Sequence, residues 1–498
     1  MNFILVTIAM CIVIWLYFTT NPLHHSRKFM IRRFINWFPM GMTYAFLYMA
    51  RYNLNVSKNA LGSLMSNNAF GIIFGVGATV YAVSLIFNGP FVDKIGGKKG
   101  MVIACLGSCI ANVAMGLVTY LLLKGQITGN VVLIFSVLYG VNMFFQSYGA
   151  VSIIKVKSYW FHVRERGVFG AIFGTLISFG VYFAFDWGSA IADAATLKPG
   201  PHGFNGAQKL IRTLFAIDTG TTDATWLVFF IPAFLLIFWA LINMITLKDT
   251  PSQANFEDFD TCDASSGEME VEYSIGGLLK RFFTNPILLA VSAIEFSSGA
   301  VRNGVIQWYY TFAKQVPQPG AEFFYNNWGL LLCLTGVIGG FLSGWMSDRL
   351  FQSRRGPPAA ILSGCTLVLL SLMAFFIFSS PIIAGLTAVL ISLTGIGVHA
   401  IMSGTAAADF GGRKGAATAA GVTDGFVYLG TGVQSFCIGA LVEKSWSLFP
   451  IFLIPFAIAA VFLALRIWKA IPEATKRYLL MVEKVTMVEK VIVISKEA

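Results

Sequence analysis

The chain has 498 residues, of which 56% are hydrophobic and 12% are charged. This composition excludes a water-soluble domain of the same size, and apolar runs of about 18 or more residues, each predicting a transmembrane helix, recur along most of the length. The net charge of +11 does not indicate nucleic-acid binding, because the basic residues lie in short turns between apolar segments, as the positive-inside rule describes for helical membrane proteins.

Thirteen apolar segments are predicted to cross the bilayer. The first, 3–19, is followed by a basic cluster that places its end in the cytoplasm; we expect it to be an extra anchor outside the main bundle. The other twelve divide as six plus six, over residues 35–58, 70–92, 100–123, 130–153, 168–187, 225–247, 285–312, 326–347, 358–378, 381–403, 415–441 and 447–470.

An acidic, polar segment separates the two sets of six and predicts a mobile cytoplasmic linker. We therefore expect an N-terminal helix with a basic turn, a first half, the linker, a second half and a cytoplasmic tail. The bounds are 1–33, 34–248, 249–283, 284–471 and 472–498. The loop 188–224 is expected to be the main external feature, since basic residues gather in the turns on the other side.

A short repeat supports the division into halves. The pattern G-x-x-x-D-[KR] occurs at Asp93-Lys94 and again at Asp348-Arg349. Two parallel six-helix repeats with the substrate at their interface describe a large class of secondary transporters. Acids beside basic residues at cytoplasmic helix ends can pair in one state and separate in another. We therefore predict a gating role for these four residues.

Two arginines, Arg51 and Arg302, lie inside apolar segments at corresponding places of the two halves. Arginine inside a bilayer is costly and points to function. Each lies about 25 Å of helical rise beyond a basic residue at a cytoplasmic helix start, which places both guanidinium groups near mid-membrane. Their planar donor forks match phosphate or carboxylate oxygens. Tyr44 and Tyr48 share a helix face with Arg51, so the sequence predicts a central pocket for an anion.

The alternative is that each arginine pairs with an internal acid and only holds helices together. Glu295, seven residues before Arg302, and Asp424 in the span 415–441 are the candidates. His399 also lies in an apolar run, where a packed neutral histidine and a proton-coupling group both remain open. Lys58 is expected at the external mouth, either attracting anions or forming a solvated helix end.

Other functional classes find little support. The seven cysteines show no CxxC pair or metal-ligand spacing, so neither a disulfide framework nor a metal site is predicted. There is no Walker A loop and no nucleophile–base cluster. We expect no cofactor and no enzymatic activity.

Four segments carry a family resemblance. They are Tyr44-x-x-x-Tyr48-x-x-Arg51-x-Asn53, Arg302-x-Gly304 with Trp308, the loop from Gly344 to Gly356, and Thr418-Ala-Ala-Gly421 through Tyr428-Leu-Gly430. With these motifs the chain resembles the major facilitator superfamily, and within it the organophosphate–phosphate antiporters, which include glycerol-3-phosphate and hexose-phosphate transporters. The resemblance runs from about residue 35 to 471.

The resemblance implies an all-α membrane protein of the major facilitator fold, with twelve core helices plus the extra N-terminal one. It implies that Arg51 and Arg302 bind the phosphate of a small organic phosphate, with Tyr44, Tyr48, Asn53 and Trp308 in the same site. Rocking of the halves would then carry substrate across in exchange for inorganic phosphate. We expect a multi-pass, monomeric protein in the plasma membrane, of the bacterial inner-membrane type, with a cytoplasmic C-terminus.

The chain also departs from the family pattern. Leu85 stands where these transporters carry a lysine, Leu176 and Ile177 lie where a histidine is expected, and Asp424 replaces a small residue. Asp424, Glu295 and His399 could therefore couple transport to protons, because burial favours a protonated carboxyl group. A sugar-phosphate sensor of the same fold and a proton-coupled transporter of another organic anion remain the alternatives.

Overall fold

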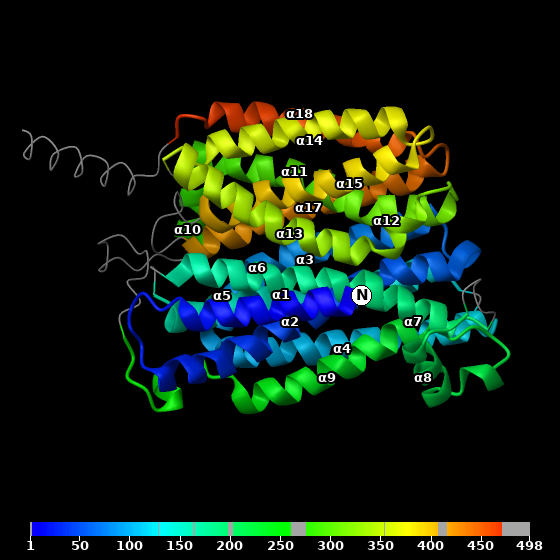
Figure 1. The fold of residues 1–498 in the computed structure, drawn as a ribbon, viewed down its shortest axis with the longest axis horizontal. Helices are drawn as coiled ribbons and strands as arrows, with labels where there is room; N and C mark the ends of the chain where they lie inside the picture. Colours follow the sequence, from blue (N-terminus) through cyan, green and yellow to red (C-terminus); the bar gives the residue numbers. More distant parts are fainter. Residues whose placement is uncertain are drawn as a thin grey trace, which may run out of the picture.

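The computed structural model describes residues 2–127, 129–162, 165–197, 203–259, 275–352, 354–406 and 416–470, and its regular elements there are helices. The long helices run side by side along one axis (Figure 1). Each of the thirteen predicted spans falls on a helix: α1 Asn2–Thr19, α2 Arg27–Leu61, α3 Asn67–Ile95, α4 Gly97–Leu123, α5 Val131–Trp160, α6 Arg166–Tyr182, α9 Leu227–Thr246, α11 Pro286–Gln315, α13 Trp328–Trp345, α14 Gly356–Phe376, α15 Pro381–Ile401, α17 Ala416–Val442 and α18 Leu448–Arg466.

Ten of the described helices are long and apolar enough to cross a membrane. The two arginine-bearing helices, α2 and α11, are not among these ten, and both carry many polar and charged residues. The apolar part of α1, Val6–Thr19, is shorter than the others. The bundle is therefore a membrane-type helical fold whose least apolar long helices are the ones that carry the candidate site.

Local sequence signals begin several of these helices. The side chains of Ser26, Ser66 and Asn130 accept hydrogen bonds from backbone N–H groups in the first turns of α2, α3 and α5. Asn285 and Ser380 do the same for α11 and α15, each followed by a proline in the first turn. These caps satisfy N–H groups that have no partner within the helix, and proline is tolerated there because its missing N–H is not needed.

Helices α2 to α9 form one group and α11 to α18 another, in the lower and upper parts of Figure 1. The groups meet mainly where α3 packs against α17 and α6 against α13. Glycine permits the first contact: a Cβ added at Gly71 would lie 2.4 Å from the carbonyl oxygen of Ser435 and 2.9 Å from Cα of Gly439. Small residues let membrane helices approach this closely.

The bundle has two distinguishable ends. The basic end is where α2 begins and α3 ends, with Arg27, Lys94 and Lys98 at the helix ends there. The opposite end is where α2 ends and α3 begins. Near the opposite end the two groups are joined by hydrogen bonds between Asn67 and Gln315, at 3.1 Å, and from the backbone N–H of Asn68 to Glu443, at 3.1 Å. The groups are therefore held together at the opposite end.

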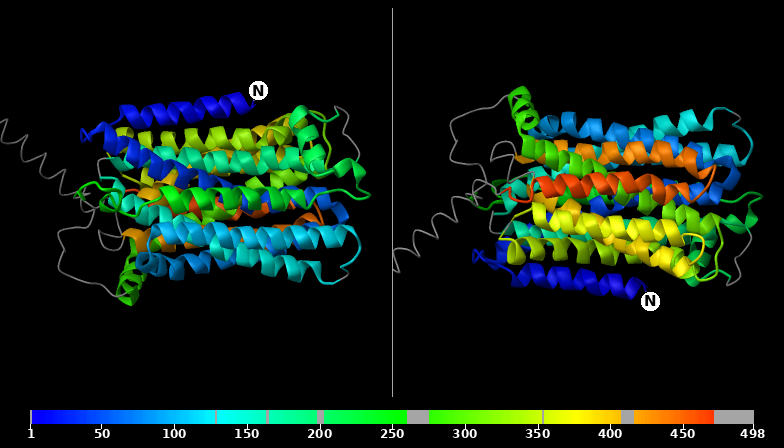
Figure 2. Two further views of the ribbon diagram at one scale, coloured as in Figure 1. Left: turned by 90° about the horizontal axis from the view of Figure 1, so that it is seen from below. Right: turned by 90° about the horizontal axis from the view of Figure 1, so that it is seen from above.

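Helix α1 lies along the outer edge of the bundle (Figure 2). Its Tyr17 hydroxyl donates to the carbonyl oxygen of Met30 at 2.9 Å and accepts from Nε of Arg33 at 3.0 Å. Arg33 also binds both carboxylate oxygens of Glu165, each at 2.8 Å. Burial alone would raise the pKa of Glu165, but hydrogen bonds from His25 and Arg33 outweigh it and lower the pKa to about 2. These contacts fasten α1 to the basic end.

Two predicted irregular segments contain helices. The expected loop 188–224 holds α7 Gly188–Ala195 and α8 Gly206–Leu214, because Asn205 and Gln208 form a capping box and Arg212 donates to the carbonyl oxygens of Ala194 and Thr196. The expected linker holds α10 Ile275–Thr284, but most of its acidic part, 260–274, lies outside the described residues, as does the tail. A short helix α12, Glu322–Asn326, precedes α13.

Candidate functional site

Arg51 lies in the middle of α2 and is fully buried, with 0% of its surface exposed. Its Nε donates to the side-chain oxygen of Gln146 at 2.9 Å, and its Nη1 donates to the hydroxyl of Tyr428 at 2.5 Å. The remaining nitrogen, Nη2, has no hydrogen-bond partner. Among the described residues no acidic side chain forms an ion pair with Arg51. The predicted alternative, an internal acid partner, is therefore not realised for this arginine.

Aromatic rings surround the same guanidinium group. Its central carbon lies 4.7 Å from the ring centroid of Tyr48, 4.5 Å from that of Tyr81 and 5.4 Å from that of Tyr428. Tyr44 contacts Tyr48 edge-on at 5.3 Å. Ring faces attract a cation without neutralising its charge. The positive charge of Arg51 therefore remains available to an anion.

A chain of buried amides lies behind Arg51. Gln146 donates to Asn142 at 3.2 Å, and Asn112 donates to Asn142 at 3.1 Å. Asn53 donates to Asn112 at 2.7 Å. The structure therefore places Asn53, a predicted binding residue, at the far end of this chain and not beside the arginine. Its contribution is to position α4 and α9 against α2, through Asn112 and the carbonyl oxygen of Val228.

This amide chain was missed by the sequence reasoning, although a signal was present. Asn142 and Gln146 stand four residues apart in an otherwise apolar span, so they share one helix face. Buried amides need partners, and such a pair points to a polar neighbour on another helix. Here that neighbour is Arg51, which Gln146 orients.

Arg302 lies in the middle of α11 and is partly exposed. Its Nε is buried without a hydrogen-bond partner. A Cβ added at Gly395 of α15 would lie 3.1 Å from Cβ of Arg302 and 3.4 Å from its Cγ, so the arginine side chain packs tightly against this glycine. Both arginines thus retain a buried donor nitrogen with no partner.

The residues next to the arginines bring the two groups together. Tyr52 donates a hydrogen bond to Asn303 at 3.3 Å, and Asn303 donates to Thr431 at 2.7 Å. Tyr52 follows Arg51 and Asn303 follows Arg302. The contact between Tyr52 and Asn303 therefore sets the arginine-bearing turns of α2 and α11 at the same level of the bundle. Trp308 lies further toward the opposite end, where it is buried and donates to Gln434 at 3.0 Å.

The predicted coupling residues form a cluster in the second group. His399 on α15 contacts Glu295 on α11 at 2.9 Å, and Glu295 is fully buried. Ser403 donates to Asp424 of α17. The second carboxylate oxygen of Glu295 has no partner. Glu295, proposed above as a partner for Arg302, is therefore paired with histidine in this structure.

The predicted gating residues lie at the basic end. Asp93 forms an ion pair with Lys155 of α5 at 2.9 Å, while Lys94 is exposed. The backbone N–H of Lys98 donates to Asp249 at 2.7 Å. In the second half Arg349 is exposed, and the side chain of Asp348 lies outside the described residues.

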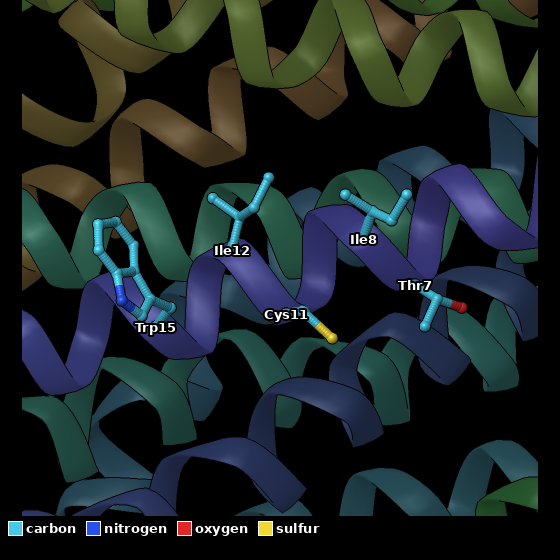
Figure 3. Close-up of a pocket in the computed structure, with 5 residues that line it drawn as sticks. All are labelled: Thr7, Ile8, Cys11, Ile12 and Trp15. Atoms are coloured by element: carbon cyan, nitrogen blue, oxygen red, sulfur yellow. The ribbon is translucent and has the colours of Figure 1, made fainter.

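A shallow hollow lies on the outer face of α1, away from the arginines. Figure 3 shows its lining side chains, which are Thr7, Ile8, Cys11, Ile12 and Trp15. The hollow has no charged lining residue, and Ile8, Ile12 and Trp15 are half-exposed or more. Such a face fits contact with lipid and not the recognition of an anion.

A model of the Major Facilitator Superfamily matches residues 29–435, and the chain belongs to that superfamily. A crystal structure of a bacterial homolog of the human lysosomal transporter Spinster, inward-facing and unoccupied, has the same fold. It aligns with a TM-score of 0.65 over 89% of this chain and 98% of that chain, at 15% identity.

Within the superfamily, the predicted resemblance to the organophosphate–phosphate antiporters is confirmed. The chain is 24% identical to the probable hexose phosphate transport protein of Chlamydia trachomatis, over 89% of this chain and 92% of that protein. It is 24% identical to the glycerol-3-phosphate transporter of Bacillus subtilis, with coverages of 85% and 89%. It is 22% identical to the membrane sensor protein UhpC of Escherichia coli, with coverages of 81% and 85%.

Proposed function

We propose that this protein is a secondary active transporter of a small organic phosphate, of the glycerol-3-phosphate or sugar-phosphate class, and not an enzyme. The observation that carries the proposal is Arg51, which is fully buried, has no acidic partner among the described residues and keeps one guanidinium nitrogen unpaired. A buried charge without a counter-ion is costly. An anionic substrate with phosphate oxygens supplies both the charge and the missing acceptors.

Arg302 is proposed as the second contact to the same phosphate, from the other half. Tyr44 and Tyr48 would line the pocket. Asn53 and Trp308 would support the pocket walls without touching the substrate. The unpaired Nε of Arg302 supports this assignment. So does the hydrogen bond between the neighbouring residues Tyr52 and Asn303, because it aligns the two arginine-bearing turns.

The proposed transport cycle is alternating access between two halves, 34–248 and 284–471, joined by the linker 249–283. In this scheme twelve core helices and the extra helix of segment 1–33 cross the plasma membrane. The basic end and the tail 472–498 face the cytoplasm. The hydrogen bonds between the groups near the opposite end then describe a state closed to the outside. Asp93, Lys94, Asp348 and Arg349 would act at the cytoplasmic gate.

The first proposed transport mode is exchange of the organic phosphate for inorganic phosphate. The protein is proposed to act as a monomer. The test is a screen of purified protein in phosphate-loaded proteoliposomes. Uptake of labelled glycerol 3-phosphate or glucose 6-phosphate that requires internal phosphate supports the mode. Thermal stabilisation by these esters and not by their dephosphorylated forms supports the binding step. Absence of both effects for every phosphate ester would contradict the proposal.

The contact between His399 and Glu295 favours a second mode, coupling to protons. A histidine and a buried carboxylate at 2.9 Å can share and release a proton, and Asp424 adds a further carboxylate in the same half. Uptake driven by a pH gradient without internal phosphate supports this mode, and Glu295→Gln, His399→Gln and Asp424→Asn should then reduce the pH dependence. Unchanged pH dependence in all three variants would rule it out.

The similarity to the sensor UhpC favours a third candidate, a membrane sensor for sugar phosphates. The same arginine site could bind a ligand without moving it. Binding of a phosphate ester by purified protein, with no flux in vesicles under any internal condition, would support the sensor. Measurable exchange would exclude a sensor that carries out no transport.

A further inference from the structure

A stripe of polar side chains continues from Arg51 toward the opposite end of α2. Tyr44, Tyr48, Arg51, Asn55 and Lys58 follow one another at spacings of four and three residues, so they lie along one helix face. Lys58 is seven residues beyond Arg51, about 10 Å along the helix axis. The stripe therefore runs from the proposed binding site to the end of the bundle that is closed in this structure.

Lys58 is not a solvated helix end, which was one of the two expectations from the sequence. Only 2% of its surface is exposed. Among the described residues no acidic side chain forms an ion pair with it. The acid that acts on its charge is Glu443, an exposed residue beyond the end of α17. The side chain is therefore almost fully enclosed, while its ammonium group has no acidic partner within ion-pair distance among the described residues.

Two asparagines beside Lys58 are also unsatisfied. Asn55 is fully buried, and neither its amide nitrogen nor its amide oxygen has a hydrogen-bond partner. The side-chain nitrogen and oxygen of Asn59 are likewise buried without partners. Residues 55, 58 and 59 are spaced i, i+3 and i+4, so they form one patch on α2. One ammonium group and two amide NH₂ groups are therefore available together.

The chemistry of this patch selects an anion. An unpaired buried donor costs about 1–3 kcal/mol, and more if it is charged. A phosphate or carboxylate group satisfies all three donors and also neutralises the charge. Water would satisfy the amides, but it would add no negative charge to that of the exposed Glu443. A cation is excluded because Lys58 would repel it.

The contacts around the patch explain why it is closed here. At the same end Asn67 is hydrogen-bonded to Gln315, and Glu443 accepts a hydrogen bond from the backbone of Asn68. Phe70 packs against Trp308 with 5.3 Å between ring centroids. These three contacts join α3 of the first group to α11 and to the end of α17, both in the second group. Separation of the groups at this end would open a path to Lys58.

We propose that Asn55, Lys58 and Asn59 form a second anion-binding station, which receives the phosphate group of the substrate from the external side before it reaches Arg51. This inference rests on the proposed function, because the substrate class is the same. When the external side opens, Glu443 moves away with α17 and the incoming anion takes its place as the counter-charge of Lys58. The station thus serves entry from one side of the membrane only.

The test compares the two directions of exchange. In oriented vesicles, Lys58→Gln should raise the external half-saturation concentration for glucose 6-phosphate or inorganic phosphate by about tenfold or more, the effect of about 1.4 kcal/mol. The internal half-saturation concentration should not change. Lys58→Arg should retain most of the external affinity. Lys314→Gln is the matched control, because Lys314 lies at the same end and contacts the rings of Tyr310 and Tyr325 but is not part of the patch.

A second measurement does not depend on flux. Equilibrium dialysis with inorganic phosphate should find one fewer bound phosphate per chain in Lys58→Gln than in wild type, and Asn55→Leu should weaken the same site. Unchanged external affinity together with unchanged phosphate binding in Lys58→Gln would overturn the station. Equal losses from both sides would also overturn it. If wild type moves no phosphate ester, the proposed function fails, and the dialysis result then decides the station by itself.

Discussion

Tyr52 of α2 donates a hydrogen bond to Asn303 of α11 at 3.3 Å, and each of these residues immediately follows an arginine. The contact crosses the boundary between the two helix groups. It therefore ties the level of Arg51 in the first group to the level of Arg302 in the second. Two guanidinium groups held at one level, each with an unpaired donor nitrogen, are what a two-sided contact to a phosphate group requires.

Gln146 should determine the affinity of the Arg51 site. Gln146→Glu places a carboxylate where the amide oxygen now lies, 2.9 Å from Nε of Arg51, and this charge competes with the substrate. We expect the half-saturation concentration to rise by about tenfold to a hundredfold, as loss of about 1.5–3 kcal/mol from charged hydrogen bonds implies. Exchange of radiolabelled substrate in proteoliposomes measures this half-saturation concentration.

The neutral variant Gln146→Leu separates charge from positioning. It removes the hydrogen bond to Arg51 without adding a competing anion, so its effect should be smaller than that of Gln146→Glu. Equal affinity in wild type and Gln146→Glu would show that the guanidinium group does not bind the substrate.

Gly71 should control closure of the opposite end. In Gly71→Ala the new Cβ would lie 2.4 Å from the carbonyl oxygen of Ser435, so α3 and α17 must move apart. A cysteine introduced at Gln315 should then react faster with a membrane-impermeant maleimide. The control is Gly340→Ala, because a Cβ at Gly340 meets nothing within 4 Å. Identical labelling rates in Gly71→Ala and the control would mean that the contact between α3 and α17 at Gly71 does not hold this end closed.

Glu165 should make the free energy of unfolding depend on pH in the acid range. Its pKa in the folded protein is about 2, below the ordinary 4.5, so the stabilisation is complete above pH 4.5 and is lost as the pH falls toward 2. Glu165→Gln leaves the buried Arg33 without its counter-ion and should lower the free energy of unfolding by about 3 kcal/mol at pH 7.

Thermal unfolding in detergent at pH 7 and pH 3.5 measures this effect. The loss of stability between these pH values should be smaller in Glu165→Gln than in wild type. Glu257→Gln, at an exposed position, serves as the control. The same pH dependence in wild type and Glu165→Gln would remove Glu165 as its source.

All thirteen predicted spans fall on helices, and ten of the described helices are long and apolar enough to be recognised as membrane spans from hydropathy. The sequence did not predict α7 and α8, whose stability depends on contacts such as those of Arg212 with Ala194 and Thr196. These contacts join residues that have no periodic pattern. Helix α2 also begins earlier than predicted, at Arg27 and not at residue 35, because Ser26 caps a polar first turn that precedes the apolar span.

The candidate site was predicted in part. Arg51 and Arg302 stand out in sequence because charged residues in apolar spans are rare. The partners of these arginines could not be predicted in the same way, because they come from other helices. Gln146 and Tyr428 lie 95 and 377 positions from Arg51. Asn53 was placed in the site by its position in the motif, whereas the structure directs its side chain to Asn112.

The most direct test of the central claim is uptake by Arg51→Lys and Arg302→Lys in proteoliposomes loaded with inorganic phosphate. Lysine keeps the charge but lacks the planar donor fork, so both variants should insert and fold yet lose exchange of glycerol 3-phosphate or glucose 6-phosphate. Arg466→Lys, at the exposed end of α18, should exchange like wild type. Exchange at the wild-type rate by both Arg51→Lys and Arg302→Lys would contradict the two-arginine phosphate site.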